Sequence, residues 1–359
     1  MLRRMLLSVL LGLSPAFPAL ADAPRIALVA PQTGPFSILG AQMRDGAALA
    51  ARQQGMEHVL VEENCQPGSG PAIARQIQES GAKAAIGFLC SESLDGSLAI
   101  LKDAAIPAIT LSVRWKGVME DALKNDWPLY RMAPSTDDEA ERITEVILRD
   151  WSGSAFALIE DGTIHGRELT ETIRNALEER GLKPVFTDTF RPGQEQQVAL
   201  VRRLKKAGAS HVFVGGDRND VAVIARDAAA ERISLTLMGG DSLKASDQAV
   251  PLAEGVLAVI LPDHANQPAA RSVAADMRAA GIEPEGYVLL AHAAVTVVAQ
   301  GVGAAGALGM PLAQVIGETH ADTVIGPIAF NDRHELGDNP YRLMEWRDGR
   351  FVEPGATAQ

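Results

Sequence analysis

The segment 154–190 decides the fold of this chain: it reads SAFALIE at 154–160, GRELTETIRNALEERG at 166–181 and PVFTDTF at 184–190. The first and last pieces are short runs of the kind that form β-strands, whereas the middle piece has helical spacing and ends at Gly181. A strand, a helix and a second strand in this order predict one unit of a parallel sheet, because parallel strands need a crossover connection.

The same alternation of strands and helices continues in both directions. The N-terminal half has expected strands at 25–31, 58–65, 84–90 and 107–113, and expected helices at 40–54, 71–80 and 93–104. The C-terminal half adds strands at 211–216, 235–240 and 255–261, and helices at 195–208 and 219–231. Continuous apolar strands separated by amphipathic helices are typical of parallel sheets covered on both faces. We therefore expect an α/β protein with two doubly wound parallel-sheet lobes.

The segment after these strands follows a different pattern. Residues 284–306 form a long apolar stretch that contains a histidine and several glycines, which indicates a buried helix and argues against a membrane span. A short strand is expected at 326–330. Residues 341–352 read as two strands around Asp348-Gly349, a strong hairpin signal.

Composition excludes some classes of partner. The chain has 359 residues, 47% of them hydrophobic, which is enough for two globular domains. Its formal charge of −12 argues against nucleic acid as a partner, because phosphate contacts need clustered Lys and Arg.

The first residues read as a secretory signal peptide. Arg3 and Arg4 precede a short apolar run, and Ala19-Leu20-Ala21 fits the small-x-small cleavage rule. We expect residues 1–21 to be removed and the mature chain to lie in the periplasm. An N-terminal membrane anchor is the alternative.

The chain has two cysteines, Cys65 and Cys90. An even count in an exported protein predicts a disulfide between them, and both follow expected strands on one rim. Two free buried thiols are the alternative.

The sequence offers little for catalysis, a cofactor or a metal ion. It has no phosphate-binding loop, no dinucleotide fingerprint after the first strand and no histidine pair with zinc-ligand spacing. Residues 240–243 spell GDSL, the nucleophile block of a class of esterases, but no D-x-x-H block follows to supply a base for Ser242. We expect no catalytic residue, no cofactor and no metal, and keep a secreted GDSL-like esterase as a distant alternative.

In doubly wound sheets, ligands bind beyond the carboxyl ends of the strands. Two lobes that present such ends to each other would form one cleft. The loops expected to line it are 31–40, 90–93, 112–115, 160–166, 215–219 and 240–243.

Seven segments, in their order and spacing, resemble one known family, the substrate-binding proteins of branched-chain amino-acid ABC importers. These are type I periplasmic binding proteins of the leucine/isoleucine/valine-binding kind. The segments are PQTGPFSILGAQMRDGA at 31–47, IGFLCSES at 86–93, YRMAPSTDDEA at 130–140, HGRELTETIRNALEERG at 165–181, FVGGD at 213–217, MGGDS at 238–242 and GPIAFNDRHELGDNPYRLMEWRDGRFV at 326–352.

The resemblance implies how the lobes are connected. Three crossovers near 133–135, 262–264 and 331–341 would form a three-stranded hinge. The first lobe would comprise residues 22–134 and 263–335, and the second lobe residues 135–262 and 336–359. The family closes by this hinge onto its ligand, and its amino-acid-binding members have a disulfide where Cys65 and Cys90 fall.

The resemblance also implies the ligand-binding residues. Ser91 matches a serine that holds the ligand carboxylate. Arg114 stands where the family has a small hydroxyl residue, and Ser112 is close by in the sequence. The remaining three positions are His165 and Asp217, which replace two tyrosines, and Asp241, which takes the place of the acidic partner of the ammonium.

This pocket is more charged and less aromatic than that of a leucine binder. Arg114 is suited to pair with a carboxylate, and an internal ion pair with Asp217 or Asp241 is the alternative. An amino acid with a polar side chain, a small carboxylate or an amide are all open as ligands. The expected role is that of a monomeric solute-binding protein that delivers its ligand to the permease subunits of an ABC importer. A ligand-sensing protein for a membrane receptor is the alternative.

Overall fold

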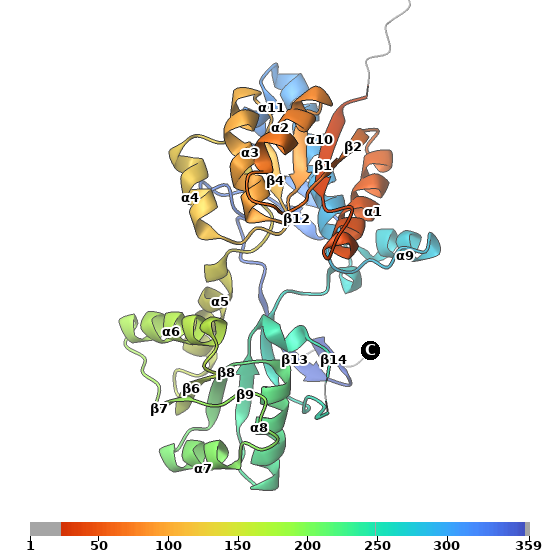
Figure 1. Cartoon of the computed structure of the whole chain (residues 1–359). Helices are drawn as coiled ribbons and strands as arrows, with labels where there is room; N and C mark the ends of the chain where they lie inside the picture. Colours follow the sequence, from red (N-terminus) through yellow and green to blue (C-terminus); the bar gives the residue numbers. More distant parts are fainter. Residues whose placement is uncertain (1–22, 248, 356–359) are drawn as a thin grey trace, which may run out of the picture.

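The computed structural model describes residues 23–247 and 249–355. They form two lobes joined by a narrow waist (Figure 1). Each lobe contains one large sheet, as the strand and helix pattern predicted. The expected signal peptide lies outside the described residues.

The sheet of the first lobe is entirely parallel, in the order β2-β1-β3-β4-β5. Its strands are β1 (Arg25–Ala30), β2 (Glu57–Glu62), β3 (Ala84–Gly87), β4 (Ala108–Thr110) and β5 (Leu129–Arg131). Its helices are α1 (Ser37–Gln53), α2 (Gly70–Glu79), α3 (Ser91–Asp103), α4 (Lys116–Lys124) and α10 (Val288–Leu308). Successive residues of β1 face opposite sides of the sheet: Ile26 and Leu28 pack in a cluster with α1 and α10, and Ala27 packs with α2, α3 and α4.

The sheet of the second lobe has the order β14-β13-β10-β9-β8-β6-β7. Its strands are β6 (Phe156–Glu160), β7 (Phe186–Thr189), β8 (His211–Gly215), β9 (Thr236–Gly239), β10 (Leu257–Ile260), β13 (Arg342–Arg347) and β14 (Arg350–Val352). Helices α5 (Thr136–Asp150) and α6 (Ile164–Glu179) cover one face, and α7 (Val198–Ala207) and α8 (Arg218–Ala230) cover the other.

One edge of this second sheet departs from the expected parallel pattern. β13 pairs antiparallel with β10, and β14 pairs antiparallel with β13. The turn between them has positive φ at both Asp348 (51°) and Gly349 (76°), as a two-residue hairpin turn requires. The sheet is therefore parallel through β6–β10 and closed at one edge by a hairpin.

The chain passes three times between the two sheets. It leaves β5 for α5, leaves β10 for the short helices η2 (His264–Asn266) and α9 (Arg271–Ala279), and leaves the first lobe again before β13. Ser135 starts α5 with a capping box, because its hydroxyl accepts the N–H of Asp138 while Asp138 accepts the N–H of Ser135. The residue at which each lobe begins stays a prediction.

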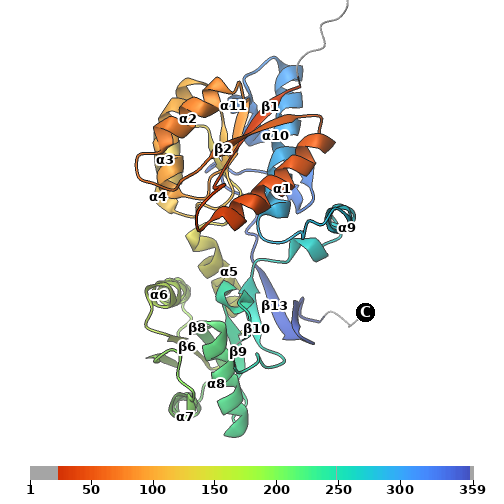
Figure 2. The same cartoon turned by 45° about the vertical axis from the view of Figure 1, so that its right-hand side comes forward.

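Helix α10 corresponds to the long apolar stretch at 284–306, for which the sequence predicts a buried helix. It is long and apolar enough to cross a membrane, but 67% of its most apolar window is buried inside the molecule. Figure 2 shows it next to α1. The two helices approach so closely that a Cβ at Gly46 would lie 1.9 Å from the carbonyl oxygen of Val288. The helix is thus a core element of the first lobe.

Smaller elements complete the first lobe and one loop of the second. They are α11 (Leu312–Val315), η3 (Ile316–Glu318), the antiparallel pair β11 (Ala321–Thr323) and β12 (Gly326–Ile328), and η1 (Asp241–Lys244) after β9.

Candidate functional site

The carboxyl edges of both sheets face the space between the lobes. The chain runs from the carboxyl end of β5, and from that of β10, directly into segments that cross to the other lobe. Since the neighbouring strands are parallel, their carboxyl ends lie on the same side. All six expected ligand-binding residues follow such ends: Ser91 follows β3, Ser112 and Arg114 follow β4, His165 follows β6, Asp217 follows β8 and Asp241 follows β9.

A contact of Arg114 spans the two lobes. Its Nη1 donates a hydrogen bond of 3.2 Å to Oη of Tyr341, which is fully buried just before β13. Burial raises the pKa of Tyr341, so its hydroxyl stays protonated. No ion pair among the described residues includes Arg114, and its partner is therefore a hydroxyl rather than the carboxylate of Asp217 or Asp241.

A buried carboxylate that the sequence did not indicate lies beside Asp241 in the second lobe. Glu139, in the first turn of α5, is 7% exposed, and its Oε1 accepts the backbone N–H of Asp241 at 2.7 Å. A Cβ at Gly240 would lie 2.1 Å from the same oxygen, so this approach needs glycine. A Glu in a polar first turn reads as a surface residue, and nothing in the local sequence indicated its burial.

The pKa of Glu139 depends on its burial and on three of the expected residues. Burial raises the pKa of Glu139, whereas the hydrogen bond from the N–H of Asp241 lowers it; the Asp241 carboxylate raises it, and His165 and Arg114 lower it. Asp241 also accepts the N–H of Leu261 at 3.0 Å, which ties it to the end of β10.

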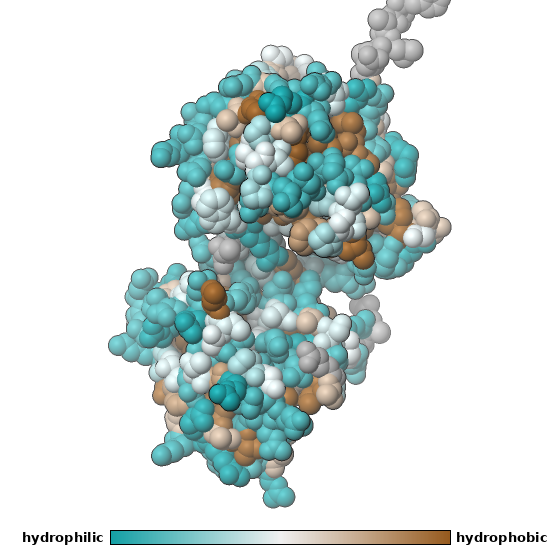
Figure 3. Space-filling model, viewed as in Figure 1, coloured by the Kyte–Doolittle hydropathy of each residue, from teal (hydrophilic) through white to brown (hydrophobic). Residues whose placement is uncertain are grey.

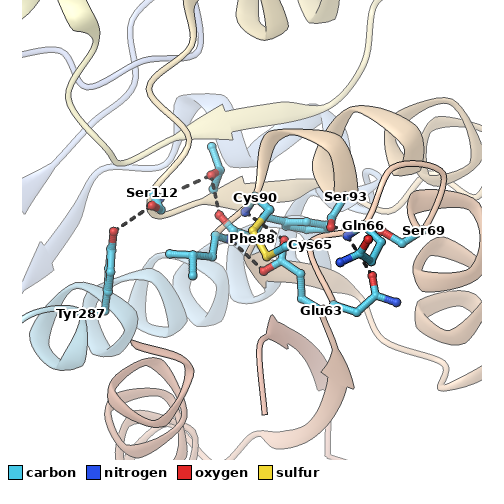
Figure 4. Close-up of a disulfide and its surroundings, with 12 residues drawn as sticks. Glu63, Cys65, Gln66, Ser69, Phe88, Cys90, Ser93, Ser112 and Tyr287 are labelled. Atoms are coloured by element: carbon cyan, nitrogen blue, oxygen red, sulfur yellow. Dashed lines mark hydrogen bonds between the residues drawn. A yellow bond between two sulfur atoms is a disulfide. The ribbon is translucent and has the colours of Figure 1, made fainter. Parts of the chain in front are cut away.

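Two serines and a tyrosine add hydroxyl groups to the first lobe's rim. The hydroxyl of Ser112 lies 2.7 Å from that of Tyr287 (Figure 4). The backbone N–H of Tyr287 donates to Oε1 of Gln42 at 3.2 Å. Ser91 is half-buried at the first position of α3, next to Cys90. Ser91 and Ser112 thus follow the neighbouring strands β3 and β4, and Arg114 follows β4 as well.

Asp217 and His165 are the most exposed of the expected residues on the second lobe. Asp217 is the N-cap of α8, and its Oδ1 accepts the N–H of Asp220 at 2.9 Å. His165 is the second residue of α6 and is exposed. The structure assigns Asp217 a capping role, and a ligand contact for either residue stays a prediction.

The expected disulfide between Cys65 and Cys90 is confirmed, with Cα atoms 5.4 Å apart. It joins the loop after β2 to the start of α3 (Figure 4). Glu63 lies beside it, fully buried, and accepts the N–H groups of Leu89 (2.8 Å) and Cys90 (3.0 Å). Burial is the main reason that the pKa of Glu63 is raised to about 7.

The serine of the GDSL segment has a structural partner. Ser242 lies in η1, and its hydroxyl donates to the carbonyl oxygen of Gly216 at 2.7 Å. This bond joins the loop after β9 to the loop after β8. The hydroxyl is therefore used as a donor to the backbone.

The comparison with protein families decides the class of the molecule. A family model described as "periplasmic binding protein" matches residues 24–350. The chain belongs to the periplasmic binding protein family. The match confirms, over nearly all of the described residues, the resemblance of this binding protein to the family inferred from its sequence.

Curated relatives of this binding protein carry names of amino-acid binders. The leucine-, isoleucine-, valine-, threonine- and alanine-binding protein of Pseudomonas aeruginosa is 25% identical over 340 residues, which cover 91% of this chain and 90% of the relative. The Leu/Ile/Val-binding protein homolog 3 of Brucella melitensis is 25% identical and covers 91% of this chain and 92% of its own length.

Solved structures with the same fold hold different ligands. The ABC transporter substrate-binding protein of Desulfitobacterium hafniense, in complex with Leu, has a TM-score of 0.66 at 20% identity and covers 92% of this chain and 99% of its own. A solute-binding protein of Rhodopseudomonas palustris, in complex with p-hydroxybenzoic acid, has a TM-score of 0.63 at 14% identity, covering 92% and 95%. At these identities the structures establish the fold of the binding protein.

Proposed function

We propose that this binding protein captures an amino acid, or a polar compound of similar size, between its lobes and delivers it to the permease of an ABC importer. The observation that carries the proposal is the opposite charge of the two rims. Arg114 stands on the first lobe and donates a hydrogen bond to Tyr341 of the second lobe, on which Asp241 and Glu139 also stand, with Glu139 bound to the N–H of Asp241.

A zwitterion fits this arrangement. The guanidinium of Arg114, with the hydroxyls of Ser91 and Ser112 near it, suits a carboxylate. The carboxylate of Asp241, beside the buried Glu139, suits an ammonium group, which supplies three donors. Both charged ends lose water when the lobes close, so each needs a partner that offsets the cost of desolvation.

Delivery to an importer rests on the family and on the expected export. Residues 1–21 are expected to be a secretory signal peptide, and such peptides direct proteins out of the cytoplasm. In the periplasm, binding proteins of this family deliver their ligands to permeases. We expect the mature chain to begin at Asp22, which the intact mass of the exported protein measures. A mass that retains residues 1–21 would contradict export as a free periplasmic protein.

The ligand is identified by a thermal-shift screen of amino acids, small organic acids and amides, followed by calorimetry. A ligand at 100 times its Kd stabilises the folded state by about 2.7 kcal/mol. For lobes of this size we expect a rise in Tm of roughly 5–10 °C. One-to-one saturable binding is the expected result; continuing heat release would indicate turnover, and an unchanged Tm with every class would contradict the proposal.

A further inference from the structure

A buried guanidinium joins three segments at the waist of the molecule. Arg131 is the last residue of β5 and is fully buried. Its backbone N–H donates to the carbonyl oxygen of His334 at 2.9 Å, in the segment that crosses to β13. Its side chain reaches both that segment and the loop that carries Arg114.

The guanidinium of Arg131 holds the backbone of the Arg114 loop. Its Nη1 donates to the carbonyl oxygens of Arg114 (3.0 Å) and Trp115 (3.3 Å). Its Nη2 donates to Oε1 of Glu335, with which it forms an ion pair. A guanidinium at this depth is tolerated because a carboxylate and two carbonyls share its charge.

Glu335 is itself fixed in the crossing segment. Its backbone N–H donates to Oδ1 of Asn331 at 3.1 Å, and Arg333 lies 3.2 Å from its second carboxylate oxygen. The side chain of Arg333 is 67% exposed, whereas that of Glu335 is 14% exposed. The pair with Arg131 is therefore the buried interaction of Glu335, and the pair with Arg333 is a surface one.

Arg114 is consequently held at both ends by residues of the waist. Its carbonyl oxygen is bound by Arg131, and its guanidinium donates to Tyr341. Tyr341 is positioned in turn by Asn339, whose side chain accepts the N–H of Tyr341 and donates to the carbonyl oxygen of Asp138 at the start of α5. A rotation of the crossing segments would move both supports of Arg114.

The surroundings leave room for such a movement. A cavity of about 290 Å³ lies against Arg131 and Glu335 and is bounded by α5, α6 and the start of α4. Its walls are mostly polar or charged side chains. The ion pair thus borders a space on one side and a close-packed sheet on the other.

We propose that Arg131 is a positioning residue for Arg114, and that its pair with Glu335 couples the place of Arg114 to the crossing segments. The inference rests on the proposed function, in which Arg114 faces the ligand. Arg131 does not touch the ligand itself. It fixes the loop from which Arg114 extends.

The decisive test needs no ligand. Hydrogen–deuterium exchange of the purified protein is compared between wild type, Glu335→Gln and the matched control Arg333→Gln, which removes only the exposed partner of Glu335. We expect amides in 111–120 to exchange at least about tenfold faster in Glu335→Gln, because the Arg114 loop opens more often, and to stay unchanged in Arg333→Gln. Amides of α2 serve as the internal reference. Equal exchange in 111–120 for all three proteins would overturn the coupling.

A second arm separates this inference from the proposed function. Binding of the compound that gives the largest rise in Tm in the thermal-shift screen is measured for wild type, Arg114→Gln, Glu335→Gln and the double variant. If Glu335 acts through Arg114, its loss weakens binding by about tenfold in the wild-type background and not in the Arg114→Gln background. Additive losses would overturn the positioning role. No effect of Arg114→Gln on binding of this compound would count against the proposed site, while the exchange experiment still decides the coupling.

Discussion

Asp241 is an expected ligand-binding residue whose hydrogen bonds the structure shows. Its backbone N–H is bound by Glu139, and its Oδ1 accepts the N–H of Leu261. The carboxylate is half-buried and accepts one hydrogen bond from the residues that the structure describes. A carboxylate in this state keeps capacity for a further donor, and a ligand ammonium is a suitable one.

Replacement of Asp241 by asparagine should separate binding from folding. Asp241→Asn keeps an oxygen that can accept from Leu261, so we expect the Tm of the empty protein to change little. Loss of the charge should weaken ligand binding by roughly 2–5 kcal/mol, as for a buried, hydrogen-bonded charge. Calorimetry measures the loss, with Asp150→Asn, at the exposed end of α5, as the control. Affinity within a factor of about three, or roughly 0.65 kcal/mol, would remove Asp241 as an anchor.

Glu63 gives the first lobe a dependence on pH. Its pKa is raised to about 7 in the folded protein from an ordinary value of 4.5. Below that ordinary value the carboxyl is protonated in both states. As pH rises towards 7 the unfolded chain releases the proton first, so the stabilising effect of the protonated group is lost over this window.

The variant Glu63→Gln has no proton to release. We therefore expect the free energy of unfolding of wild type, relative to the variant, to fall by up to about 3 kcal/mol between pH 4.5 and pH 7. Urea unfolding across this range measures the difference, and Glu79→Gln, at an exposed end of α2, is the control. Parallel stability curves for wild type and Glu63→Gln would show that the folded-state pKa is not raised.

At the scale of elements, the disulfide ties two strand–helix loops of the first lobe. It closes a loop of sequence separation 25 between Cys65 and Cys90. Chain entropy predicts a stabilisation of about 3.5 kcal/mol for such a loop.

Reduction of the disulfide should therefore lower the free energy of unfolding by about 3.5 kcal/mol in urea, because the unfolded chain regains freedom. Protein that has been reduced and alkylated is compared with protein that has been alkylated without reduction. Thiol titration of unfolded, unreduced protein should find no free thiol. Two free thiols, or identical unfolding midpoints, would contradict the bridge and its stabilising role respectively.

Most elements could be predicted because they are long enough to show a period. The strand expected at 154–160 appears as β6, and the helix expected at 166–181 as α6. β5 was not predicted because its three residues include the buried Arg131, so it lacks the continuous apolar run that indicated the equally short β4. The sequence predicted the hairpin at Asp348-Gly349. It did not predict that β13 of this hairpin pairs with β10, because the paired residues are more than 80 positions apart.

The candidate site was harder to predict, because its contacts also join residues far apart in the sequence. The predicted strand ends were sufficient to locate the loops that carry all six expected residues, at the carboxyl edges of the two sheets. Their partners could not be predicted, because Ser112 meets Tyr287 across a separation of 175 residues and Arg114 meets Tyr341 across 227. Such contacts follow from how the two lobes are connected and not from any local pattern.

At the scale of the whole molecule, each lobe has its own apolar core. The buried members of each apolar cluster in the described residues lie within one lobe. Contacts across the waist are polar instead, as between Arg114 and Tyr341. Figure 3 shows a mainly hydrophilic surface that narrows between the lobes. Rotation about the crossing segments therefore exposes little core, as hinge closure requires.

The last prediction is that ligand binding closes this cleft. Charges on opposite rims cannot both contact one small molecule while the lobes stay apart, so saturating ligand should lower the radius of gyration in small-angle X-ray scattering. The ligand with the largest rise in Tm is used. Asp241→Asn at the same ligand concentration is the control, and we expect it to keep the radius of the empty protein, because closure is driven by the ligand's differential affinity for the closed form. A rise in Tm of wild type without any decrease in its radius would mean that the ligand binds to one lobe alone, and the opposed charges of Arg114 and Asp241 would then not act on the same molecule.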